Sequence, residues 1–279
     1  MAGLEGRTLL MSGGSRGIGL AIALRAAEDG ANVALLAKTA KPDPRLEGTI
    51  HTAAAQIEKA GGTALPIVGD VRDEDSVKGA VEQTVARFGG IDICVNNASA
   101  IALDTTEALP MKRYDLMQDI NTRGTYLLSR ECVPHLRRGA NSHVLTLSPP
   151  FNMEPHWFAD HLAYTISKYG MSMCTLGLAH EFAADGIAFN SLWPRTLIAT
   201  DAVRNIIGGE ETIRRTRSPR VMADAAHAIL VRDSRETTGN FYIDVEVLAE
   251  AGIDDLGSYQ GDDALEPRLD IFIDEEESG

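Results

Sequence analysis

Tyr164 and Lys168 are the side chains in this sequence best suited to proton transfer, because they lie four residues apart in a segment with a helical apolar pattern. At that spacing both side chains project from one face of a helix, one turn apart. An ammonium group close to a phenol favours the phenolate, so Lys168 is expected to lower the pKa of Tyr164 toward the working pH. A Tyr-x-x-x-Lys pair is common by chance, and its meaning depends on the groups around it.

Polar residues at the ends of predicted strands could form a site together with Tyr164 and Lys168. Ser148 and Asn97 each follow a predicted strand, and Asn121 lies in a long predicted helix at 112–137. Doubly wound sheets bind ligands at the carboxyl ends of their strands, where the hydroxyl of Ser148 could donate to a substrate carbonyl. These positions predict one polar site at the edge of a sheet.

A glycine-rich turn near the N-terminus predicts a dinucleotide site. Residues 12–19 read Ser-Gly-Gly-Ser-Arg-Gly-Ile-Gly and join a short apolar run to a segment with helical periodicity, a context that favours binding over a plain turn. Gly13 permits the tight turn, Gly17 lets backbone approach a pyrophosphate, and Gly19 lets the helix pack close to the strand. Free N–H groups at the start of the helix favour phosphates. The same turn is expected to bring three more residues to the cofactor: Ser15, Arg16 and Ile18.

The end of the second predicted strand favours NADP(H) over NAD(H). A site that prefers NAD places a carboxylate there for the ribose 2′-OH, whereas this chain has Lys38. Together with Arg16, Lys38 could neutralise a 2′-phosphate, although an exposed lysine is as often solvated surface. Asp70, at the end of the third predicted strand, could accept from the adenine amino group or cap the following helix.

Strand-like and helix-like segments alternate along most of the chain. Expected strands lie at 9–11, 32–37, 64–68, 91–96, 143–147, 188–192 and 240–243, and expected helices follow the glycine turn and lie at 49–60, 74–87, 112–137, 162–184 and 223–231. Such alternation implies right-handed crossovers and a parallel sheet with helices on both faces. The fold class is therefore α/β, a Rossmann-type doubly wound parallel sheet of about seven strands in a single domain.

The domain is expected to span residues 1–253, with an acidic extension at 254–279. Within that extension four apolar side chains could dock a short segment: Leu269, Ile271, Phe272 and Ile273. Without docking, the last half-dozen residues are expected to be disordered.

Taken in order, the glycine turn, Asn96-Asn97-Ala98-Ser99, Asn121, Ser148 and the Tyr164–Lys168 pair resemble the short-chain dehydrogenase/reductase family over nearly the whole chain. The resemblance implies that Tyr164 is the acid/base and that Lys168 binds the nicotinamide ribose. It also implies that Ser148 orients the carbonyl or alcohol and that Asn121 holds a proton-relaying water. The residues that it adds to the cofactor site are Val71, Asn97, Tyr164, Lys168 and Pro194.

Several positions depart from the family pattern. Ser148 and Tyr164 lie further apart than the family usually has them, which enlarges the loop between them. The apolar residues of that loop could contact a lipophilic substrate, pack as a lid or meet another subunit: Phe151, Met153, Trp157 and Phe158. Arg195 replaces the usual glycine after Pro194, and Asp244-Val245-Glu246 replaces the usual Asp-Gly-Gly, so the C-terminal edge of the sheet is expected to be built differently.

Composition and charge argue against several classes of function. The 279 residues carry a formal net charge of −14, and residues 244–279 hold 13 acidic residues and one basic residue, which argues against nucleic-acid binding. No apolar run approaches the ~18 residues of a membrane helix, and the start lacks a secretion signal, so we expect a soluble, cytoplasmic protein with no membrane span. Three cysteines and scattered histidines predict neither a disulfide framework nor a metal site.

The sequence thus predicts an NADP(H)-dependent oxidoreductase that interconverts a ketone or aldehyde and an alcohol. The expected substrate is lipophilic, of fatty-acyl or sterol type, as in lipid metabolism, and family habit suggests a homodimer or homotetramer. One alternative is a non-catalytic dinucleotide-sensing or scaffold protein on the same fold. Another is reduction of an activated C=C bond, which needs the tyrosine and lysine but not the same serine.

Overall fold

Seven parallel strands form one sheet within the part of the chain that the computed structural model describes, residues 3–42, 48–261 and 265–274. They are β1 (Thr8–Ser12), β2 (Asn32–Ala37), β3 (Thr63–Val68), β4 (Ile93–Asn96), β5 (Ser142–Thr146), β6 (Ile187–Trp193) and β7 (Phe241–Ile243). Their spatial order is β3-β2-β1-β4-β5-β6-β7. The order reverses between β1 and β4, and the crevice at such a reversal is where doubly wound folds bind ligands. The α/β fold expected from the sequence is confirmed.

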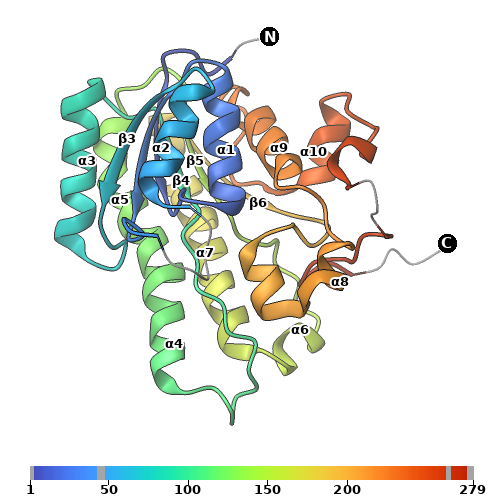
Figure 1. Cartoon of the computed structure of the whole chain (residues 1–279). Helices are drawn as coiled ribbons and strands as arrows, with labels where there is room; N and C mark the ends of the chain where they lie inside the picture. The colour runs from blue at the N-terminus through green and yellow to red at the C-terminus, as the bar shows by residue number, and fades with distance from the viewer. Residues whose placement is uncertain (1–2, 43–47, 262–264, 275–279) are drawn as a thin grey trace.

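Helices cover both faces of the sheet, as Figure 1 shows. The main helices are α1 (Gly17–Glu28), α2 (Ile50–Lys59), α3 (Glu74–Phe88), α5 (Gly124–Leu136), α7 (Leu162–Glu181), α9 (Arg220–Leu230) and α10 (Asp244–Glu250). Apolar residues of α1, α2, α9 and α10 join one buried cluster, and those of α3, α5 and α7 join another. Strands covered on both faces are largely apolar, and every residue of β1, β4, β5 and β6 is buried, including polar residues such as Asn96, His143 and Asn190.

The single helix expected at 112–137 is three elements in the structure. It comprises α4 (Met111–Met117), a π-helical turn at Gln118–Arg123 and then α5. Asn121 lies in the π-helical turn and is fully buried. Single π-helical turns within α-helices are frequent at functional sites, and this one directs Asn121 inward.

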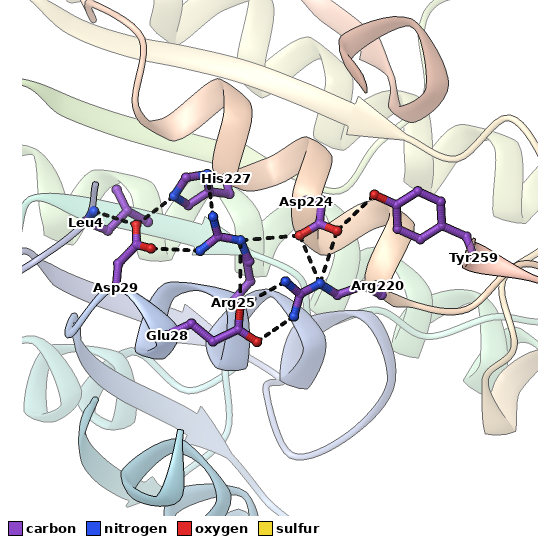
Figure 2. A network of polar contacts seen from close by, with 8 residues as sticks. All are labelled: Leu4, Arg25, Glu28, Asp29, Arg220, Asp224, His227 and Tyr259. Carbon is purple, nitrogen blue, oxygen red and sulfur yellow. Dashed lines mark hydrogen bonds and ion pairs between the residues drawn. The ribbon is translucent and has the colours of Figure 1, made fainter. Parts of the chain in front are cut away.

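A network of charged side chains fastens α1 to α9 (Figure 2). Arg25 of α1 lies between two carboxylates, 2.8 Å from Asp29 and 3.3 Å from Asp224 of α9. His227 of α9 also contacts Asp29, at 2.7 Å. The hydroxyl of Tyr259 donates to Asp224 at 2.9 Å. Because α1 begins at the glycine turn, this network fixes the helix that positions the turn.

The acidic C-terminal extension returns to the carboxyl edge of the sheet. Leu269 forms an antiparallel bridge with Thr196, and the backbone N–H of Asp270 donates to the carbonyl of Arg195 at 3.0 Å. Phe272 is 1% exposed, so the expected docking of this apolar run does occur. Disorder was expected for the last residues of the chain, and residues 275–279 lie outside the described part.

The remaining short elements connect these parts. They are α6 (His156–Ala159), a 3₁₀ turn at Ala183–Asp185, a π-helical turn at Val203–Gly208, α8 (Gly209–Ile213) and a 3₁₀ turn at Gly257–Tyr259. Within the described ranges no helix combines the length and apolar character needed to cross a bilayer.

Candidate active site

The glycine turn between β1 and α1 has the geometry that phosphate binding needs. Gly13 and Gly17 have φ values of 79° and 57°, in the left-handed region that glycine adopts without strain. A Cβ added to Gly19 would lie 2.4 Å from Nδ2 of Asn97. That amide donates to the carbonyls of Ser12 and Gly13, at 3.0 Å each, so Asn97 holds the turn in place.

A cavity of about 910 Å³ opens beside this turn, at the switch point of the sheet. Its size and its position against free helix N–H groups fit a dinucleotide. It is lined by most of the residues predicted for the cofactor: Gly13, Ser15, Arg16, Gly17, Ile18, Lys38, Asp70, Val71 and Asn97.

Charges cluster at the far end of this cavity. The ammonium of Lys38 lies 3.5 Å from Asp70, and Arg72 lies 2.7 Å from the same carboxylate. The hydrogen bonds from Arg72 lower the pKa of Asp70 to about 2. The alternative role of Asp70 as a helix cap is wrong, because α3 is capped by Asp73, whose side chain accepts from the N–H of Ser76.

Tyr164 and Lys168 share a second, smaller cavity of about 180 Å³. Tyr164 is 5% exposed, and its hydroxyl makes no hydrogen bond with any residue that the structure describes. The ammonium of Lys168 donates to the carbonyl of Leu147 at 2.7 Å and lies 4.9 Å from the centre of the Trp193 ring. α7 thus places both side chains at one cavity, as their spacing indicated.

The pKa of Tyr164 departs from its ordinary value in the direction opposite to that expected. Burial raises it, and the carboxyl of Asp270 raises it further. Burial also lowers the pKa of Lys168 to about 7, which weakens the positive charge that was expected to stabilise a phenolate. Burial thus favours the protonated form of Tyr164, and its part in catalysis stays a prediction.

Ser148 does not line the cavity that Tyr164 and Lys168 share. It is 0% exposed, and its hydroxyl lies 2.9 Å from that of Ser191, which in turn bonds to Thr175 at 2.8 Å. Ser148 is absent from the described residues that line the Tyr164 cavity. In this structure the hydroxyl of Ser148 belongs to a chain of buried hydroxyls, and its expected role toward a substrate carbonyl stays a prediction.

The side chain of Asn121 forms hydrogen bonds to two segments next to the site. Its side chain accepts from the N–H of Ala100 at 2.7 Å and donates to the hydroxyl of Ser167 at 2.9 Å. Ser167 is the neighbour of Lys168, so Asn121 links α7 to the loop that follows β4. Among the described residues, Asn121 makes no hydrogen bond to Lys168.

Arg195 contacts both Asp244 and Glu246, so the residues that depart from the family pattern lie together at the C-terminal edge of the sheet. Pro194 lines the Tyr164 cavity, and the backbone N–H of Arg195 donates to Asp244 at 2.8 Å. Burial raises the pKa of Asp244 to about 6. The guanidinium of Arg195 lies 3.8 Å from Glu246.

Aromatic residues of the enlarged loop after β5 pack against α7 and the C-terminal segment. Phe151 lies edge-on to Tyr169 at 5.5 Å, and Trp157 lies 5.8 Å from Phe272. Met153 is 68% exposed. None of the loop's four apolar residues lies among the described residues that line the Tyr164 cavity, and their contact with a substrate, a lid role and a subunit contact all stay open.

Asp270 was not recognised from the sequence. It lines the Tyr164 cavity together with Ile271 and Trp193, and it is the acidic member of that lining. One signal was present: Asp270 is an acid flanked by the apolar residues Leu269 and Ile271, which is unusual in so acidic a tail.

Comparison with known proteins agrees with this arrangement. Residues 7–211 match the family described as short chain dehydrogenase. The chain is 54% identical over 272 residues to hydroxysteroid dehydrogenase-like protein 2 of Xenopus tropicalis, and 50% identical over 276 residues to that of Homo sapiens. Each alignment covers 98% of this chain but 64% of the relative, so the chain spans less than two thirds of these proteins. A crystal structure of a putative dehydrogenase from Xanthomonas campestris is 53% identical, with a TM-score of 0.95 over 98% of this chain and 100% of that one.

Proposed function

Because the chain belongs to the short-chain dehydrogenase family, an NAD(P)-dependent class of oxidoreductases, we propose that it interconverts a ketone or aldehyde and an alcohol with NADP(H). The observation that carries the proposal is the placement of Tyr164 and Lys168 at one cavity, next to a larger cavity suited to a dinucleotide. A binding protein without turnover would not need a phenol and an amine facing the same small space.

Proton transfer falls to Tyr164. When bound, a reduced nicotinamide supplies a hydride to the carbonyl carbon, and the carbonyl oxygen then takes a proton to become the hydroxyl. Burial raises the pKa of Tyr164, so its phenol carries the proton needed at neutral pH. Lys168 lies on the same face of α7, where it can bind the nicotinamide ribose and return a proton to the tyrosine.

The lining of the small cavity supports a lipophilic substrate of fatty-acyl or sterol type. Most of its side chains are apolar, including Ile101, Leu147, Trp193, Ile198, Val203, Met222 and Ile271. An apolar pocket with a few convergent polar groups is typical of a site that orients a lipophile by its reacting end. At about 180 Å³ the cavity holds that end rather than a whole sterol.

Cation placement supports NADP(H) over NAD(H). Lys38 and Arg16 both line the dinucleotide cavity, and Arg72 lies beside Asp70 at the same end. The Asp70 carboxylate is already engaged by two cations, which leaves positive charge for a 2′-phosphate.

A second candidate is reduction of an activated C=C bond. The buried hydroxyl of Ser148 favours it, because that reaction needs the tyrosine and lysine but not the serine. With an α,β-unsaturated ketone as substrate, the product distinguishes the two: an allylic alcohol from carbonyl reduction, or a saturated ketone from C=C reduction.

We also propose a homodimer or homotetramer in a cytoplasmic setting. All three cysteines carry free thiols, as expected in a reducing compartment. Exposed apolar side chains on α7 favour self-association: Leu162, Ile166, Met173 and Leu176.

Tyr164→Phe tests the proposed function directly. We expect NADPH oxidation with a panel of medium- and long-chain carbonyls to fall by at least ~10²-fold, because the variant loses the proton donor. NADPH binding, followed by nucleotide fluorescence, should remain close to that of the unchanged protein. Tyr114→Phe, on α4, is the control and should keep full activity. Turnover retained in Tyr164→Phe would remove this residue from its role, and no turnover by the unchanged protein on any carbonyl would favour the sensor or scaffold alternative.

A further inference from the structure

The ammonium of Lys168 lies over the face of an indole ring. Its Nζ is 4.9 Å from the centre of the ring of Trp193, the last residue of β6, and an aromatic face attracts a cation within ~6 Å. Lys168 is 3% exposed and Trp193 is 7% exposed, so water screens this contact little. Both side chains line the small cavity together with Tyr164.

A buried ammonium usually pairs with a carboxylate, but Lys168 forms no such ion pair in the described ranges of the chain. Its Nζ donates to the carbonyl of Leu147 at 2.7 Å and lies 3.5 Å from the sulfur of Met171. A thioether is a weak acceptor. The Leu147 carbonyl and the Trp193 face are therefore the two contacts that chiefly offset the burial of this charge.

The C-terminal segment holds the Trp193 ring in place. The indole N–H donates to the carbonyl of Ile271 at 2.9 Å, and the ring of Phe272 lies 6.0 Å from that of Trp193. The backbone N–H of Asp270 fastens the same segment to the carbonyl of Arg195 at 3.0 Å. Because the indole is bound at its N–H edge, its face stays turned toward Lys168.

We propose that Trp193 is a positioning residue, whose ring holds the charged ammonium of Lys168 at the cavity where Tyr164 transfers its proton. The proposal rests on the proposed function and deepens it. Trp193 itself transfers no proton and acts only through Lys168. The charged form is the one that this role needs, because an ammonium has three N–H donors and a proton to return to Tyr164.

Two other titratable groups line the same cavity in the described part of the chain: Tyr164 on α7 and Asp270 on the C-terminal segment. Burial lowers the pKa of Lys168 to about 7, and Asp270 opposes this change. Burial also raises the pKa of Asp270 to about 7, so its charge changes over the same range of pH. Lys168 is therefore best titrated in protein that carries Asp270→Asn.

Lysine labelled with ¹³C at Cε reports the charge of Lys168 in the absence of any ligand. Its resonance is the one that Lys168→Arg lacks. When Trp193→Leu is added, we expect the titration midpoint of Lys168 to fall by about 0.5–1.5 in pH, because the ring no longer favours the ammonium. A ring that only filled space would give the opposite sign, since its truncation would admit water, which favours the charged form.

Fluorinated tryptophan tests the same contact with almost no change of shape, and it does so even if Trp193→Leu does not fold. The chain has two tryptophans, so Trp157→Phe leaves Trp193 as the residue that takes up the label. Fluorine withdraws electron density from the ring face. The midpoint of Lys168 should therefore fall stepwise from tryptophan to monofluorotryptophan to tetrafluorotryptophan.

Trp157 provides the matched control. Its indole N–H also donates to the C-terminal segment, to Asp274 at 3.1 Å, and its ring lies 5.8 Å from that of Phe272. It is not among the described residues that line the small cavity. Trp157→Leu should therefore leave the midpoint of Lys168 unchanged.

Activity supplies a second readout. In Trp193→Leu, kcat for carbonyl reduction should fall by about 10-fold at pH 8 and by less at pH 6, where Lys168 stays charged without the ring. Trp193→Phe keeps an aromatic face and should recover most of this loss.

Two results would overturn the proposal. One is a midpoint of Lys168 that rises or stays the same in Trp193→Leu and does not respond to fluorination. The other is an equal loss of kcat at pH 6 and pH 8, which would make Trp193 a wall of the substrate cavity and nothing more. Failure of the proposed function is distinct from both, because it would show as no carbonyl turnover by the unchanged protein or as full turnover by Tyr164→Phe, and it would leave the titration of Lys168 as expected.

Discussion

At the scale of single residues, the proposed preference for NADP(H) rests on a small group of charges that follow β2 and β3. Lys38 is 54% exposed on its side chain and lies 3.5 Å from Asp70, which Arg72 also neutralises. A 2′-phosphate placed there would meet Lys38 in water-exposed surroundings, where one charge contributes about 1 kcal/mol.

Lys38→Ala should therefore weaken NADPH binding by about 5- to 10-fold and leave NADH binding nearly unchanged. Isothermal titration of the protein with each reduced nucleotide measures both effects. Lys59→Ala, an exposed lysine at the end of α2, is the matched control. Equal losses for NADPH and NADH, or tighter binding of NADH by the unchanged protein, would contradict the proposed preference.

The residues of the site differ in how far sequence could predict them. Tyr164 and Lys168 meet because i and i+4 share a helix face, a rule that needs no tertiary structure. The pKa of Tyr164 depends on how deeply α7 is buried and on Asp270, which is distant in sequence. The orientation of Ser148 depends on Ser191 of β6, and no local pattern contains that contact.

At the scale of elements, the attachment of α1 to α9 gives a stability that depends on pH. Burial raises the pKa of Asp29, but bonds from Arg25, the N–H of Leu4 and His227 more than offset it and lower the pKa to about 2 (Figure 2). A carboxyl whose pKa is depressed in the folded state stabilises that state above its unfolded pKa of about 3.9, and this contribution is lost as pH falls toward 2.

Asp29→Asn should accordingly lower the free energy of unfolding by about 2 kcal/mol at pH 7, and by less at pH 3. Urea unfolding followed by tryptophan fluorescence at both pH values measures the difference. Glu82→Gln, an exposed carboxyl on α3, should leave stability unchanged at either pH. A deficit in Asp29→Asn that stays constant from pH 7 to pH 3 would show that ionisation of Asp29 is not its cause.

The boundaries of helices and strands show where a local sequence pattern is no longer enough to predict the structure. β2 spans Asn32–Ala37, the residues expected from an apolar run with clear ends. The helix expected at 112–137 is interrupted at Asn121 instead, because that side chain bonds to Ala100 and Ser167 from other elements. α10 begins directly after β7, at Asp244. The sequence has Asp244-Val245-Glu246 where the family usually has Asp-Gly-Gly, and this difference predicted an altered C-terminal edge of the sheet but not a helix.

At the scale of the whole molecule, part of the acidic extension lines the Tyr164 cavity rather than forming a solvated tail. Phe272 has a φ of 74°, a strained conformation for a residue with a side chain, and it packs against Trp157, Tyr164, Tyr169 and Trp193. The sequence indicated an acidic extension whose apolar run could dock, but net charge does not report which few residues of a segment are buried. The cavity that Tyr164 faces is complete only with this segment in place.

Self-association should use the outer face of α7. Leu162, Ile166, Met173 and Leu176 recur at intervals of 4, 7 and 3 residues, which places them within one narrow stripe of the helix, and their exposed fractions range from 36% to 63%. Tyr126 of α5, a helix in contact with α7, is 52% exposed. Such a stripe is costly in water and is usually covered by a partner.

Met173→Glu combined with Leu176→Glu should convert the protein to a monomer, because two carboxylates facing their symmetry mates would be desolvated without partners. Light scattering coupled to size-exclusion chromatography measures the mass directly. Val68→Glu, which adds a charge at another exposed apolar residue at the end of β3, should leave the mass of the oligomer unchanged. Since Tyr164 lies on the same helix as the stripe, loss of the partner should also loosen α7, so we expect the monomer to unfold at lower temperature. A double variant of unchanged mass would place the subunit contact on another face.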